Sequence, residues 1–83
     1  MTRDDLVLIS GDRELLFADG FDEAILGVVE RCGHPAVVVY DRDKCIQILV
    51  GEGWTETEAQ EHFSFNVEGA WVGERTPAFL YKP

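Results

Sequence analysis

The residues best suited to chemistry in this 83-residue chain are two cysteines, two histidines and a surplus of carboxylates. Glu58 and His62 are four positions apart, a spacing that places two side chains on the same side of a helix. A structural metal site needs four ligands, and no further ligand follows these two at a dependable spacing. The sequence therefore predicts no metal and no other cofactor.

Neither cysteine has the surroundings of a nucleophile. Cys45 falls on the apolar arc of a predicted helix, where a thiol is usually inert filling, and His34 precedes a proline in a predicted loop. The glycines of residues 51–53 lack the rest of a nucleotide-binding fingerprint. We therefore expect no catalytic residue and no enzymatic activity. Cys32 and Cys45 are expected to be free thiols in a reducing cytoplasm rather than a disulfide.

A second group of polar residues would form a ligand pocket at the end of the predicted sheet. Tyr40 closes the best predicted strand, and Lys44 lies one turn into the helix that follows. Aspartate, glycine and asparagine are also what turns require, so turn and capping roles explain the same set. The candidate pocket residues are Asp19, Tyr40, Lys44, Asn66 and Arg75.

The strongest local pattern predicts one amphipathic helix over Thr55–Gly73. Thr55 and Glu58 have the spacing of a capping box at its start, and Gly73 would end it. Asn66 falls within the apolar stripe, so its amide needs either a backbone partner or a ligand. The stripe expected to rest on the core consists of Ala59, Phe63, Val67 and Ala70.

Charge is concentrated on this same helix. Residues 51–74 carry six glutamates and no lysine or arginine, in a chain of net charge −9. Direct binding to nucleic acid or to an anionic membrane is disfavoured, because affinity for phosphate comes from basic side chains. A partner protein with a basic surface is the natural complement, although an acidic surface also serves solubility alone. The candidate partner-binding residues are Glu56, Glu58, Glu61, Phe65, Glu68 and Glu74.

The order of elements predicts a single α+β domain over residues 1–83, with a frayed tail at residues 1–5. We expect a small, mostly antiparallel sheet of three to five strands, with two consecutive helices packed on one face. A chain of this size buries only about 60% of its unfolded surface, and a homodimer would add burial. The predicted strands are Leu6–Ile9 and Leu15–Phe17 as a hairpin, then Ala24–Val29, Ala36–Tyr40 and Ala78–Tyr81, with a helix capped by Asp41 before the acidic one.

Three stretches resemble a family of small acidic proteins encoded by tailed bacteriophages. They are LFADGFDEAILGV, VVVYDRDKCIQIL and WTETEAQEHFSFNVEGAWVGERTPAFL, and the specific part runs from Glu58 to Pro77. That family shares a D-G-F-x-x-A, V-Y-D-x-x-K and E-A-x-E-x-F-x-F-N-V-x-G-A-x-V-G-x-x-T-P pattern. The resemblance implies expression in the cytoplasm of an infected bacterium; the family has no settled biochemical role to carry over.

These observations lead us to expect a non-enzymatic protein that binds and modulates a host protein through its acidic helix. Such a surface would present carboxylates where nucleic-acid phosphates otherwise lie. Two alternatives remain open at this point. One is a protein that sequesters a nucleotide or another small molecule, and the other is an accessory homo-oligomer whose acidic face has no binding role.

Overall fold

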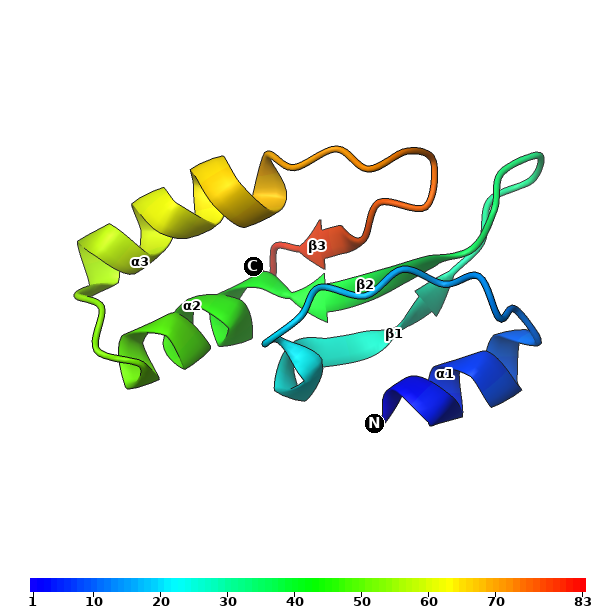
Figure 1. Cartoon of the computed structure of the whole chain (residues 1–83), viewed down its shortest axis with the longest axis horizontal. Helices are drawn as coiled ribbons and strands as arrows, with labels where there is room; N and C mark the ends of the chain where they lie inside the picture. Colours follow the sequence, from blue (N-terminus) through cyan, green and yellow to red (C-terminus); the bar gives the residue numbers. More distant parts are fainter.

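The computed structural model describes all residues 1–83 as an α+β fold with a three-stranded sheet (Figure 1). Two short helical segments, α1 (Arg3–Ser10) and η1 (Asp22–Ala24), precede the first strand. Strands β1 (Ile25–Val29) and β2 (Val37–Asp41) are followed directly by α2 (Arg42–Gly51). The chain then forms α3 (Glu56–His62), its continuation η2 (Phe63–Glu68) and the final strand β3 (Ala78–Leu80). No helix is long and apolar enough to cross a membrane.

Strand β2 is the centre of the sheet, as its β-branched sequence predicts. It pairs antiparallel with β1 and parallel with β3, so the sheet is mixed and has three strands. Val38 and Tyr40 on β2 have no exposed surface. A bulge between Ile25 and Gly27 bends the edge strand β1. The predicted α+β class, with two consecutive helices on one face of a small sheet, is confirmed.

An aromatic cluster joins the helices to the sheet. The Phe63 ring meets that of Phe79 edge-on, with centroids 4.9 Å apart, and that of Phe21 at 6.1 Å. Phe79 in turn stacks on Tyr40 at 5.7 Å. Edge-on and offset-stacked pairs of this kind add stability beyond the area they bury. The cluster therefore fixes the end of α3 against β2, β3 and the segment before η1.

The opposite face of the sheet is apolar and has no layer over it. Side chains alternate between the faces of a strand, so the neighbours of Val38 and Tyr40 point away from the core. None of these outward residues packs against the buried cluster, although most are aliphatic. Both faces of the sheet are therefore apolar, and only one is packed against the buried cluster. On the other face Val29 and Leu80 are exposed, while Val37, Val39 and Ala78 are partly buried.

The predicted N-terminal hairpin is wrong. Residues 6–9 belong to α1, which begins with a capping box between Thr2 and Asp5 and ends at Gly11, where φ is 69°. The tail predicted to fray is thus held in the first turn of a helix. Leu15 is buried, but residues 15–17 form no strand and cross the sheet as an extended segment. A Thr-x-x-Asp spacing was the signal for this helix, and it outweighed the short apolar run.

The acidic helix begins as predicted but ends early. The Thr55 side chain accepts a hydrogen bond from the Glu58 amide, and the Glu58 carboxylate accepts one from the Thr55 amide. From Phe63 the helix continues with the wider turn of a π-helix, and it ends at Gly69 instead of Gly73. A Cβ atom at residue 69 would lie 2.9 Å from the Ser64 carbonyl oxygen, so only glycine fits there.

Replacing Phe63 by alanine should lower the free energy of unfolding by about 3–5 kcal/mol, because it empties the centre of the aromatic cluster. That is a large share of the roughly 5–15 kcal/mol typical of a domain. Phe65→Ala is the matched control two residues away, where the side chain is 82% exposed, and should change stability by less than about 0.5 kcal/mol. Urea unfolding followed by circular dichroism measures both, and equal losses would contradict the assignment of Phe63 to the core.

Candidate functional site

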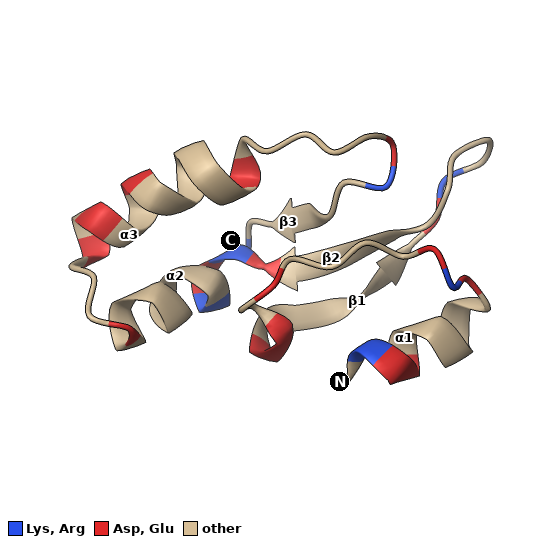
Figure 2. Cartoon of the chain, in the orientation of Figure 1, with Lys and Arg blue, Asp and Glu red and all other residues tan.

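The outward side of α3 and η2 carries an acidic and aromatic surface. Glu58, Glu61 and Phe65 line one shallow depression, together with Trp54 and His62. They lie on the same side because residues three and four apart are neighbours on a helix. The opposite side of the helix is held in the core by Ala59 and Phe63. Figure 2 shows acidic positions along α3 and no basic one.

The carboxylates of this surface have no cationic partner. Hydrogen bonds from the Thr55 amide and hydroxyl hold the pKa of Glu58 below its usual range, so the group is ionised at neutral pH. Glu56 meets only the side-chain amide of Gln60, at 3.5 Å, and Glu61 has no ion pair. None of these three glutamates therefore forms an ion pair within the chain.

Two glutamates of the predicted face do not belong to it. The Glu68 carboxylate lies 3.5 Å from Arg42 and accepts a 2.7 Å hydrogen bond from the Tyr81 hydroxyl, so its charge is used internally. Glu74 lies beside Val37 and His34 at the hairpin end of the sheet, because the chain leaves the helix at Gly69. Glu56 lies on α3 but lines a different depression, an open polar groove of about 480 Å³ that Arg42, Asp43 and Gln60 also line.

Aromatic residues share the depression with the carboxylates: Trp54 and Phe65 line it together with Glu58 and Glu61. The Trp54 ring stacks on that of His62, with centroids 4.5 Å apart. Phe65 is 82% exposed and Trp71, just past the helix, is 75% exposed. The sequence pattern gave no reason to select Trp71, because a helix that continues to Gly73 makes it an ordinary helical residue. Its exposure follows from the end of the helix at Gly69, which the sequence pattern did not predict.

Asn66 is exposed and does not lie in the apolar stripe as predicted. Its amide nitrogen donates to the His62 carbonyl oxygen at 3.3 Å and lies 3.3 Å from the His62 ring Nδ1. The wider π-helical turn rotates Asn66 away from the core, because each residue advances through a smaller angle than in an α-helix. The partner of its amide is therefore the preceding turn of its own helix.

The five residues of the candidate ligand pocket do not converge. Tyr40 has no exposed surface, and its hydroxyl accepts a 2.7 Å hydrogen bond from the Ala18 amide. Burial raises the pKa of this hydroxyl. Lys44 is exposed on α2 without an ion-pair partner, and Arg75 is bound elsewhere. Only Asp19 and Asn66 line a common hollow, so the pocket predicted from all five is wrong.

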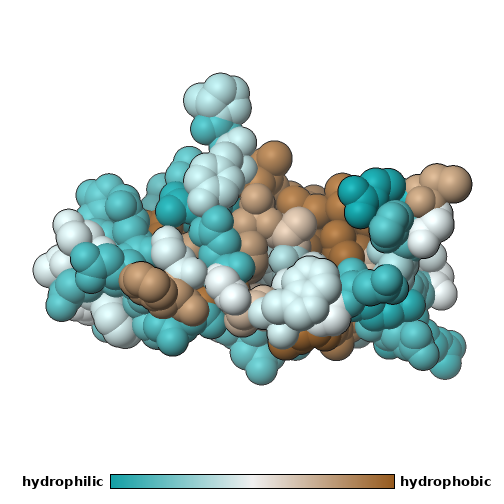
Figure 3. Space-filling view, turned by 90° about the horizontal axis from the view of Figure 1, so that it is seen from above, coloured by the Kyte–Doolittle hydropathy of each residue, from teal (hydrophilic) through white to brown (hydrophobic).

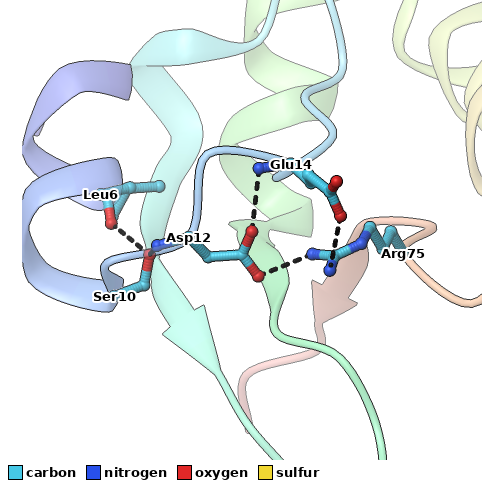
Figure 4. A network of polar contacts seen from close by, with 5 residues as sticks. All are labelled: Leu6, Ser10, Asp12, Glu14 and Arg75. Carbon is cyan, nitrogen blue, oxygen red and sulfur yellow. Dashed lines mark hydrogen bonds and ion pairs between the residues drawn. The ribbon is translucent and has the colours of Figure 1, made fainter.

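Arg75 closes a polar network between two distant segments (Figure 4). Its guanidinium donates to the carboxylates of Asp12 at 2.7 Å and Glu14 at 3.3 Å. The Asp12 carboxylate accepts a hydrogen bond from the Glu14 amide, and the Asp12 amide donates one to the Ser10 hydroxyl. Arg75 and the Glu14 amide together hold the pKa of Asp12 below its usual value. This arginine therefore fixes the turn after α1 to the loop before β3.

The two cysteines differ in their surroundings. Both thiols are free; Cys32 is exposed and Cys45 has no exposed surface. Burial raises the pKa of the Cys45 thiol to about 12, which keeps it protonated. No three His, Cys, Asp or Glu side chains lie close enough together to hold a metal ion.

Comparison with protein-family models, curated proteins and solved structures finds no match to this chain. The fold and the surface therefore define the class: a small α+β protein that presents an acidic, aromatic helix.

The two cysteines should differ sharply in reaction with a chromogenic disulfide reagent such as DTNB at pH 8. Cys32 should react within seconds to minutes, since it is exposed, and Cys45 should react at least a hundredfold more slowly until the chain is unfolded. Cys32→Ser removes the fast phase and serves as the control. Two fast thiols in the folded protein would contradict the burial of Cys45.

Asp12→Asn should lower the urea midpoint at pH 7, because Arg75 loses a charged partner. The folded pKa of Asp12 is lowered, so its contribution is complete above the unfolded value of about 3.9 and is lost as pH falls through the folded value. The variant should therefore show a flatter fall in unfolding free energy below about pH 4. Glu30→Gln, an exposed residue without an ion pair, should leave the pH profile unchanged.

Proposed function

We propose that this chain is a non-enzymatic protein that binds a basic surface of a host protein and modulates it. The observation that carries the proposal is the pair of uncompensated carboxylates, Glu58 and Glu61, beside the 82% exposed ring of Phe65. Aromatic side chains in protein interfaces often supply most of the binding energy, and charges at the rim steer association. A helix that offers both is suited to a partner with lysine or arginine around an apolar patch.

The distribution of basic residues supports the same proposal. Four of the seven lysines and arginines are tied to carboxylates of the chain itself, namely Arg3, Arg42, Arg75 and Lys82. None of these carboxylates is Glu56, Glu58 or Glu61. The unpaired glutamates of α3 therefore remain available to an external cation, and they repel nucleic acid and anionic lipid.

The π-helical segment η2 is a further argument. Such segments are rare and occur frequently at functional sites. Here the segment carries Phe65 and ends at a residue where only glycine fits. If the resemblance to phage-encoded acidic proteins holds, the partner is a protein in the cytoplasm of an infected bacterium. Charge mimicry of nucleic acid is the mode of action we infer, with the α3 carboxylates in the place of phosphates.

Small-molecule sequestration has little support from the geometry, because Tyr40 is buried and Arg75 is held by Asp12. A homodimer stays a prediction, with the uncovered sheet face as the surface it would use.

Tagged protein captured from bacterial lysate should retain a partner at about 0.1 M salt and lose most of it at about 0.5 M, where screening is much stronger. E58Q/E61Q should weaken capture about tenfold. Glutamine at residue 58 still satisfies the capping box, so the helix start is kept. Phe65→Ala should weaken binding of the captured partner about 30-fold, the size expected for a hot spot.

E23Q/E30Q is the matched control for this experiment, since it removes the same charge from exposed residues away from α3. It should capture the partner like the unaltered chain. Capture that is insensitive to salt, to E58Q/E61Q and to Phe65→Ala would contradict the proposed function.

A further inference from the structure

A second, apolar hollow lies next to the acidic surface. It has a volume of about 240 Å³ and is formed by three segments: residues 17–21, the end of η2 with the loop after it, and residues 76–79. Its apolar wall consists of aromatic and aliphatic side chains from all three segments. In the view from above (Figure 3), hydrophilic colours cover the end of the molecule that holds α3, and hydrophobic side chains reach the surface over the half that holds the sheet. The apolar lining residues are Phe17, Ala18, Phe21, Val67, Ala70, Val72, Pro77 and Phe79.

The hollow is suited to one hydrophobic side chain with a positive charge near it. Its volume is below the range of about 300–1,000 Å³ typical of small-molecule pockets. The polar residues that line it are Asp19, Asn66 and Thr76, and no lysine or arginine does. The Asp19 carboxylate is already paired with Arg3 at 3.0 Å, and the Arg3 guanidinium lies 4.9 Å from the Phe17 ring. The unpaired carboxylates are Glu58 and Glu61 of the adjoining acidic surface, and they favour an occupant that is apolar at its tip and basic beside it.

Asn66 connects this hollow to the acidic surface, since it lines both. On one side of Asn66 lie Glu58, Glu61 and Phe65, and on the other lies the apolar wall. One extended or helical segment of a partner would therefore contact both. Trp71 and Val72, which are 75% and 60% exposed, extend the apolar surface beyond the helix.

We propose that the hollow receives one hydrophobic side chain, such as phenylalanine, leucine or methionine, from a partner segment whose neighbouring residues are basic. The inference rests on the proposed function and adds the recognition element that the acidic helix alone lacks. The unpaired carboxylates on α3 would steer the basic residues, and the side chain in the hollow would fix the position of the partner segment along the helix. Specificity then depends on a hydrophobic residue spaced a few positions from lysine or arginine.

The test uses two-dimensional ¹⁵N–¹H NMR of the full chain titrated with synthetic peptides. The probe is acetyl-Lys-Lys-Ser-Phe-Ser-Lys-Lys-amide, and the control peptide has serine in place of phenylalanine. The phenylalanine peptide should shift the amide signals of residues 17–21 and 67–72 as well as those of α3. The serine peptide should bind at least tenfold more weakly and shift only α3. A third peptide, with glutamates for the lysines, should shift neither region.

Two variants of the protein separate the hollow from the acidic surface. Ala70→Leu places a larger side chain in the hollow and should abolish the shifts at residues 17–21 while α3 still responds. Ser64→Leu adds the same side chain at an exposed helical position that does not line the hollow, and should bind the phenylalanine peptide normally. The peptide comparison on the unaltered chain stands by itself if Ala70→Leu does not fold.

Equal binding of the phenylalanine and serine peptides, with shifts confined to α3, would show that the hollow does not receive the side chain. That result would not contradict the proposed function. No shift with any lysine peptide would contradict both. Signals of the hollow that move with protein concentration in the absence of peptide would also overturn the inference, because they identify a second copy of the chain as the occupant.

Discussion

Burial of the Phe63 ring is the interaction on which the rest of the structure depends. The ring has no exposed surface and contacts Phe79 of β3 and Phe21 of the segment before η1. Only 13 of 83 residues are buried, so few other contacts connect α3 to the sheet. With Phe63 fixed, the opposite side of the same helix is fixed as well. The direction in which Glu61 and Phe65 point is therefore a consequence of core packing.

Charge in this chain is divided between internal ties and an external surface. Arg75 joins Asp12 and Glu14 across more than sixty residues of sequence, and Lys82 lies 2.7 Å from Asp41, which caps α2. These pairs hold loops and chain ends that have little apolar surface of their own. The acidic helix formed by α3 and η2 takes part in only one such pair, between Glu68 at its C-terminal end and Arg42. The first two turns of α3 therefore carry three glutamates, Glu56, Glu58 and Glu61, that have no ion pair within the chain.

The change from α- to π-helix decides which residues share a surface. A regular helix through residue 73 would place Asn66 over the core and Trp71 on the helix. The wider turn instead exposes Asn66, and the stop at Gly69 releases Trp71 into a loop. The loop then returns along the hollow beside Phe17. The acidic and aromatic surface and the apolar hollow thus meet at Asn66, which lines both.

The sequence by itself determined the elements whose signals are local. The capping box at Thr55, the cap at Asp41 and the β-branched run of β2 each depend on residues within one or two turns, and all three form as predicted. Short apolar runs were ambiguous, so α1 was mistaken for a strand. Only the tertiary structure decided that the Tyr40 hydroxyl is buried against the Ala18 amide and that Arg75 pairs with Asp12. Such contacts join residues more than twenty positions apart, and nothing in local spacing or propensity encodes them.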